Sequence, residues 1–151
     1  MSGADQEEDA VPTCSTHRRR APAPVRTPEV ALSALAQATD AGRTACVVVG
    51  ELDRGRRPLA LVVVDDAHPC DLALAVDVVL AARDHRSPVA AVFLASSGEA
   101  APAEVGPAEC ALFGDLDRQL GGAGITLLDW FVLRDGSATS VAHRAGRPPA
   151  W

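Results

Sequence analysis

The sequence predicts an α/β domain in which a single mixed β-sheet is flanked by helices. Some segments repeat apolar residues at helical spacing, and others are β-branched runs bounded by turn residues. The two kinds of segment alternate along the chain, as in folds where helices pack against a sheet. The 151 residues are enough for one domain with its own core. Hydrophobic residues make up 48% and charged residues 23%, which is the balance of a globular protein.

The predicted elements follow the order α-β-β-α-β-α-β-β. Thr27 can cap a first helix that begins at Pro28 and stops at Gly42. The other helices are expected at 70–83 and 107–120, and the strands at 44–51, 59–65, 89–95, 125–133 and 137–142. Residues 53–56 and 134–136 are typical of hairpin turns, so the strands on either side of each turn should be antiparallel.

Both ends of the chain differ in composition from the domain, which we expect to span residues 28–143. Residues 1–27 combine four acidic residues, four arginines and three prolines with little periodicity, and they are expected to form a disordered leader. Residues 144–151 are rich in Pro and Gly and are expected to form a flexible tail. The run Arg18, Arg19 and Arg20 could touch nucleic acid or a membrane, although a solvated tail is the simpler interpretation.

Charge and hydropathy limit the classes of partner. Residues 29–151 carry 16 acidic and 10 basic side chains, so the domain repels phosphate and binding of nucleic acid is not expected. The apolar runs, such as those at 59–64 and 89–95, are far shorter than a membrane span, and the acidic N-terminus is unlike a signal peptide. We therefore expect a cytoplasmic protein. All 14 cations are arginines and Lys, Asn and Tyr are absent, which is typical of a GC-rich bacterial genome.

Metal-ligating residues are few. The four cysteines have no repeated spacing and are interpreted as free thiols, with Cys46 a core residue of its strand. Cys14 and His17 have half the spacing of a zinc site, but a second pair does not follow. Asp65, Asp66 and His68 lie where the second strand meets the second helix. They could ligate a metal or perform acid–base chemistry, or they could cap the helix, and capping is favoured.

Three further features have structural interpretations. Ser96 and Ser97 follow a central strand, where ligands often bind, but the sequence names no base for a nucleophile, so a polar loop is favoured. Residues 121–124 are glycine-rich but follow a helix, so they stop that helix and do not form a phosphate loop. Asp129 is an acid inside an apolar strand. Strict alternation would set it opposite Leu128 and Trp130, so that face is either solvated or supplies donors.

The segments at 89–95 and 124–130 resemble the RadC-like branch of the JAB/MPN metalloprotease-like fold. That family has an apolar strand of the A-A-V-I-L-A-H type, an H-x-H-P-S-G loop, an S-x-x-D helix start, a G-I-x-L-L-D-H strand and a D-G hairpin. The D-G turn at 135–136 and the helix after Pro69 are also similar, and the likeness covers roughly residues 27–146. It implies a JAB/MPN or cytidine-deaminase-like architecture.

The departures from that family fall on its chemistry. Family members bind zinc through the two histidines of H-x-H and the aspartate of S-x-x-D, with a glutamate that activates water. Here the matching positions are occupied by Ser96, Gly98, Gly106 and Glu109. Serine and glycine do not replace two imidazoles, and a single carboxylate does not hold zinc. Glu51 is a distant candidate for the general base.

The resemblance therefore implies a pseudoenzyme without metal or other cofactor, acting as a protein-interaction or regulatory module. Its surface would be the cleft around Ser96, Gly98 and Glu109, or the edge of the sheet. The tails could add contacts through the arginine run or through Trp151. The alternative is a hydrolase with a rebuilt site at Asp65, Asp66 and His68. The sequence does not identify the partner or the oligomeric state.

Overall fold

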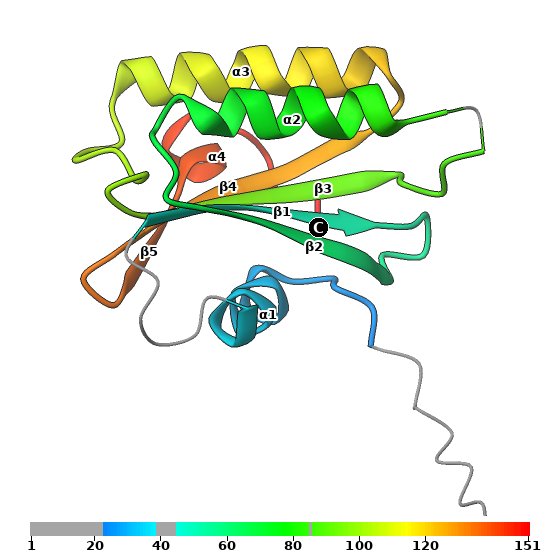
Figure 1. Cartoon of the computed structure of the whole chain (residues 1–151), viewed down its shortest axis with the longest axis horizontal. Helices are drawn as coiled ribbons and strands as arrows, with labels where there is room; N and C mark the ends of the chain where they lie inside the picture. Colours follow the sequence, from blue (N-terminus) through cyan, green and yellow to red (C-terminus); the bar gives the residue numbers. More distant parts are fainter. Residues whose placement is uncertain (1–22, 39–44, 85) are drawn as a thin grey trace, which may run out of the picture.

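The computed structural model describes residues 23–38, 45–84 and 86–151. It confirms an α/β fold with one mixed sheet of five strands, in the spatial order β2-β1-β3-β4-β5. Helices α2 and α3 cover one face of the sheet and α1 lies on the other (Figure 1). The elements are α1 (Pro28–Ala38), β1 (Ala45–Leu52), β2 (Pro58–Asp65), α2 (Asp71–Ala82), β3 (Ala91–Gly98), α3 (Pro107–Gly122), β4 (Thr126–Arg134), β5 (Ser137–Ser140) and α4 (Val141–Arg144).

Some predictions concern residues outside the described ranges. These are most of the expected leader, with Cys14, His17 and the arginines at 18–20, together with the helix stop at Gly42. The start of α1 is described and agrees with the prediction, since Thr27 Oγ1 accepts the N–H of Val30 (3.3 Å). None of the helices in the described ranges has the length and hydropathy needed to cross a bilayer.

The two faces of the sheet bury separate cores. Strand β3 lies at the centre, antiparallel to β1 and parallel to β4, and its residues from Ala91 to Ser96 are all buried. Val47, Val92 and Trp130 belong to the core under α2 and α3. Cys46, Phe93 and Phe131 belong to the core under α1. A strand covered on both faces explains the unbroken apolar run that marked β3 in the sequence.

The two predicted hairpins are present. The turn between β1 and β2 is fixed by Asp53, whose Oδ1 accepts the N–H groups of Gly55 (2.8 Å) and Arg57 (2.9 Å). The turn between β4 and β5 uses positive φ angles at Asp135 (49°) and Gly136 (74°). Such angles suit the tight turns that match the twist of a β-hairpin.

The last strand is shorter than the prediction. Val141 and Ala142, expected in a strand, instead form the first turn of α4, and Ser140 caps this helix by accepting the N–H of His143 (3.0 Å). The end of α3 also differs, because Gly121 and Gly122 lie inside the helix. The chain leaves α3 at Gly124, whose φ of 74° only glycine adopts easily.

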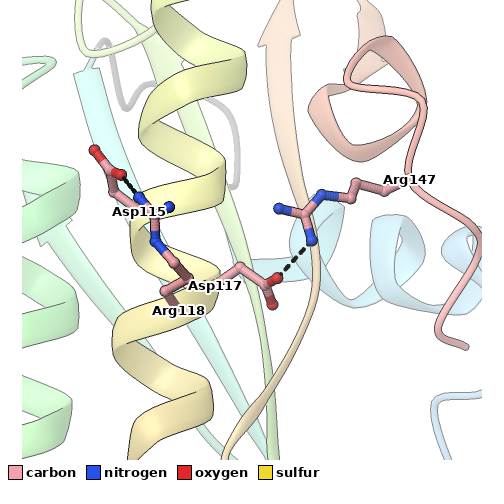
Figure 2. A network of polar contacts seen from close by, with 4 residues as sticks. All are labelled: Asp115, Asp117, Arg118 and Arg147. Atoms are coloured by element: carbon pink, nitrogen blue, oxygen red, sulfur yellow. Dashed lines mark hydrogen bonds and ion pairs between the residues drawn. The ribbon is translucent and has the colours of Figure 1, made fainter.

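Residues 145–151, which the composition predicts to be flexible, pack against the rest of the domain. Arg147 Nη1 donates to Asp117 Oδ2 of α3 (2.8 Å), while Asp115 and Arg118 pair on the outer side of the same helix (Figure 2). Further along, the indole of Trp151 stacks on Phe131, with ring centroids 6.1 Å apart. These contacts join distant parts of the sequence, so local composition carries no sign of them.

Candidate functional site

Ser96 lies at the position of the first zinc-binding histidine in the resembled family. It is part of β3, not of a loop, and it is 1% exposed. Its Oγ accepts the indole N–H of Trp130 from the neighbouring strand (2.9 Å). The next residue, Ser97, contacts the thiol of Cys46 through its hydroxyl (2.9 Å). Both hydroxyls are therefore engaged in contacts between strands, and within the described part of the chain neither is bonded to a histidine or a carboxylate.

Glu109, at the position of the family's zinc-binding aspartate, stabilises the start of α3. Its Oε2 accepts the backbone N–H of Gly106 (2.8 Å), the residue at the serine position of the family motif. Glu109 is the third residue of the helix, so this is the carboxylate half of a capping box. An anionic side chain in the first turn also complements the helix dipole. The family-like spacing thus corresponds to a helix cap in this chain.

Glu51, the distant candidate for the general base, lies at the other end of the sheet. It pairs with Val92, whereas Gly98 pairs with Ala45. Six residues along β3 correspond to roughly 20 Å. Burial raises the pKa of Glu51 above its ordinary value. Glu51 nevertheless lies too far along the sheet from Gly98 to act on a group bound there.

Asp66 and His68 line one small cavity together with Glu99, with a volume of about 140 Å³. Asp65 of β2 pairs with Cys46 of β1, and paired residues on neighbouring strands point to the same face of the sheet. Cys46 belongs to the core under α1, so the Asp65 side chain points to the α1 face. Across the described ranges, no three side chains of metal-ligating type are close enough together to hold an ion. The three candidate residues therefore share a loop but do not converge on one point.

The capping position of α2 is occupied by Cys70 and not by Asp65, Asp66 or His68, and the Cys70 side chain makes no capping bond. Asp71 Oδ2 accepts the N–H of His68 (2.7 Å). This bond joins the loop before α2 to Asp71, the first residue of the helix.

Asp129 is 3% exposed, and its environment answers the question raised by its position in the sequence. Its carboxylate accepts hydrogen bonds from Ser140 Oγ (2.6 Å), from the N–H of Trp130 (2.7 Å) and from the N–H of Ala142 (3.1 Å). This face of β4 therefore supplies hydrogen-bond donors to the carboxylate, which is one of the two possibilities that the sequence left open. Burial raises the pKa of Asp129, against the opposing effect of these donors and of the charge of His143.

A β-bulge in β4 directs Asp129 to those donors. Val92 pairs with Leu127 and Leu94 with Trp130, so β4 contains one more residue than β3 over this interval. The bulge also corrects the prediction of strict alternation, because Leu128 and Trp130 lie in the cores on opposite faces.

Ser140 and His143 line a cavity of about 250 Å³ beside Asp129, and Trp151 forms another part of its wall. The three residue types are those of a hydrolytic triad, but their bonds differ from one. Ser140 Oγ is bonded to the backbone N–H of His143 and not to the imidazole. The hydroxyl donates instead to the carboxylate of Asp129, and Ser140 serves as the cap of α4.

Apolar side chains gather on the outside of β2 and α2, a feature the sequence analysis missed. We call it the β2–α2 surface, and it consists of Leu59, Leu61, Val62, Val64, Leu74 and Val78. These residues are between 36% and 58% exposed, and outside this surface Val30 is the only other large hydrophobic residue so exposed in the described part of the chain. Val62 and Val64 point to the α2 face of the sheet and Leu61 to the α1 face, so these side chains flank the edge of the sheet on both faces. Exposed apolar side chains gathered along one edge mark a candidate site of interaction.

A signal for this surface was present in the sequence. Leu74 and Val78 fall between the buried positions of the second helix, and the run at 59–64 is apolar at every residue rather than at alternate ones. Such a run is typical of a strand covered on both faces. In the fold it lies at the edge of the sheet.

Comparison of the sequence with models of known protein families found no matching family, and comparison with curated proteins found no significant match.

Proposed function

We propose that the chain is a non-catalytic, metal-free relative of the RadC-like branch of the JAB/MPN fold and acts as a protein-interaction or regulatory module. The proposed setting is the cytoplasm of a bacterium with a GC-rich genome. The element order and the parallel pairing of β3 with β4 support the relationship. The acidic domain favours a protein over nucleic acid as the partner.

The residues at the positions that match the family's zinc site make structural contacts, which supports a non-catalytic role. Ser96 is bonded to Trp130 inside the sheet, and Glu109 caps α3 with Gly106. A zinc site would need several ligands converging on one point with their lone pairs free. These side chains instead contribute to the stability of the fold.

The observation that carries the interaction proposal is the β2–α2 surface. Six large apolar side chains remain more than a third exposed on an edge strand and the helix beside it. Edge strands usually carry charges or are covered, since an apolar edge invites another strand. A docking partner would remove this area from water and supply the driving force for association.

Thermal melts of the purified protein, with EDTA and with excess Zn²⁺, test the metal-free claim. We expect the same Tm in both, because the family-like site supplies one carboxylate. A metal at 100 times its Kd would add about 2.7 kcal/mol, which raises Tm by several degrees for a domain of this size. Such a rise would overturn the proposal.

The alternative is a hydrolase with a rebuilt site, favoured by the cavity that Asp66 and His68 share with Glu99. It predicts a zinc-dependent rise in Tm that disappears when Asp65, Asp66 and His68 are changed to Ala. The matched control is Asp115→Ala, which removes an exposed carboxylate on α3 and should leave any such rise intact.

A further inference from the structure

Strand β2 forms one edge of the sheet, and β1 is its only neighbour among the described strands. Two bonds show which residues of β1 turn their backbone groups toward β2. The carbonyl of Ala45 accepts the N–H of Ala67, and the N–H of Asp53 donates to the carbonyl of Arg57. Backbone direction alternates along a strand, so the odd-numbered residues of β1 face β2.

The same alternation assigns the groups on the outer side of β2. The partners of the odd-numbered β1 residues are Val64, Val62 and Ala60, so these three turn inward. Leu61 and Val63 then direct their N–H and C=O groups away from the sheet, while the register shift opposite Glu51 and Leu52 makes Leu59 the extra residue of a bulge. Among the described residues, the outer edge of β2 thus offers the groups of Leu61 and Val63 in the pattern that an antiparallel strand requires.

Charge is absent from the length of β2 and concentrated at its two ends. Between Pro58 and Val64 every side chain is apolar, and the strand is preceded by Arg56 and Arg57 and followed by Asp65 and Asp66. The other edge strand, β5, reads Ser-Ala-Thr-Ser and is only four residues long. The two edges therefore differ in their capacity to pair, and β2 is the one without protection.

We propose that a second copy of this chain occupies the β2 edge, in an antiparallel pair with its two-fold axis at Leu61. The inference rests on the proposed function, since it names the partner for the docking surface. In this arrangement Leu61 faces Leu61 of the second copy, and the basic end of β2 at Arg56 and Arg57 lies along the acidic end at Asp65 and Asp66. The charges at both ends of the strand are then complementary, whereas a parallel pair would place like charges together.

Helix α2 extends the self-complementary surface above the strand. Asp77 accepts a hydrogen bond from Gln119 of α3 (2.7 Å), so that side of α2 faces α3. Val78 lies about 100° further around the helix, toward β2, and Leu74 lies one turn before it. On β2, the residues on the same face of the sheet as α2 are Val62 and Val64, because their β1 partners belong to the core under α2. Two-fold pairing would bring this apolar flank against its own copy.

The mass in solution is the first test, measured by light scattering or sedimentation over a range of concentrations. We expect a dimer that dissociates on dilution and in high salt, because its end charges are exposed. Arg57→Asp and Asp65→Arg should each raise the dissociation constant about tenfold, since the two-fold axis applies each repulsive pair twice. Arg118→Asp, on the distant surface of α3, is the control and should have no effect.

Mixing the two charge variants tests the register itself. Each variant repels its own copy. In the mixture, the aspartate introduced at position 57 of one chain lies at the same end as the arginine introduced at position 65 of the other, and the unaltered arginine and aspartate lie together at the opposite end. The mixture should therefore form a one-to-one heterodimer. A mixture that stays monomeric while the unaltered chain dimerises would overturn the antiparallel register, provided that thermal melts show both variants to be folded.

A central charge gives an independent check. Leu61→Lys places two ammonium groups together at the axis and should yield a monomer, while Ala138→Lys on the opposite edge should remain dimeric. A chain that is monomeric at all concentrations would overturn the inference. The zinc melts would then still decide the metal-free part of the proposed function separately, because they do not depend on association.

Discussion

Asp129 connects three segments of the chain through a single buried carboxylate. It accepts hydrogen bonds from the hydroxyl of Ser140, from the N–H of Ala142 at the start of α4, and from the N–H of the next residue, Trp130. The bulge in β4 turns the side chain toward these donors. A buried charge is tolerated when its hydrogen-bonding capacity is filled, as it is here.

Replacing Asp129 by Ala should lower the free energy of unfolding by about 2–4 kcal/mol, because three buried donors lose their acceptor. Ser140→Ala, which removes one donor to the carboxylate and also the cap of α4, should cost about 1–2 kcal/mol. Urea denaturation measures both values. A loss below about 0.5 kcal/mol for Asp129→Ala would contradict the role assigned to this carboxylate.

Comparison with Asp129→Asn tests the raised pKa of Asp129, which follows chiefly from burial. A carboxyl that binds its proton more tightly when folded stabilises the protein below its unfolded pKa, and this contribution is lost as pH rises through the folded pKa. The asparagine variant does not titrate. Its stability relative to the unaltered protein should therefore increase as pH rises from about 3.5 to 7. A constant or opposite difference in urea titrations would contradict this.

At this scale the sequence predicted part of the candidate site. It identified Asp129 as a residue that needed donors, because an acid within an apolar strand is costly. It did not predict the bulge, since the insertion of one residue depends on the register with β3 and leaves no local pattern. For Glu109 the local signal was present: Gly106 and Glu109 have the spacing of a capping box, and that role is the one observed.

Among the elements, β1 and β3 approach closely at Gly50. The ring of Phe93 fills the space where a side chain would lie, so a Cβ at Gly50 would be 2.2 Å from Cζ of that ring. Trp151 covers Phe93 from the C-terminal segment, with ring centroids 6.2 Å apart. Glycine is required here by space and not by backbone angle.

Gly50→Ala should cost about 1–3 kcal/mol, because Phe93 must leave its position in a packed core. Gly121→Ala is the matched control, since nothing lies within 4 Å of the added carbon in α3. It should be neutral or stabilising by about 0.5–1 kcal/mol, as alanine is the better helix former. Phe93→Leu in the Gly50→Ala background should recover part of the loss. Equal effects of the two glycine substitutions would contradict the packing described.

The elements with local signals were predicted within a few residues. The turns at Asp53 and Gly136 carry their own chemistry, and the cap at Thr27 lies beside the helix that it starts. Helix α4 was missed because Val141 and Ala142 resemble a strand, and the carboxylate that binds the N–H of Ala142 is distant in sequence. The packing of the C-terminal indole on β4 was missed for the same reason.

For the molecule as a whole, the two edges of the sheet differ in what they expose. Strand β5 is short and polar and is followed at once by α4, whereas β2 is eight residues long and apolar. The sequence predicted β2 and its hairpin, but its apolar run is typical of a covered strand. That pattern and the position at the edge are reconciled if a second copy covers the strand.

Hydrogen exchange of the β2 amides, followed residue by residue by NMR at increasing protein concentration, tests this account most directly. The amides of Val62 and Val64 face β1 and should be protected at every concentration. The amides of Leu61 and Val63 should exchange fast in dilute protein and become protected as the dimer forms. Fast exchange at Leu61 and Val63 at all concentrations would contradict the account, because the β2 edge would then remain open to water.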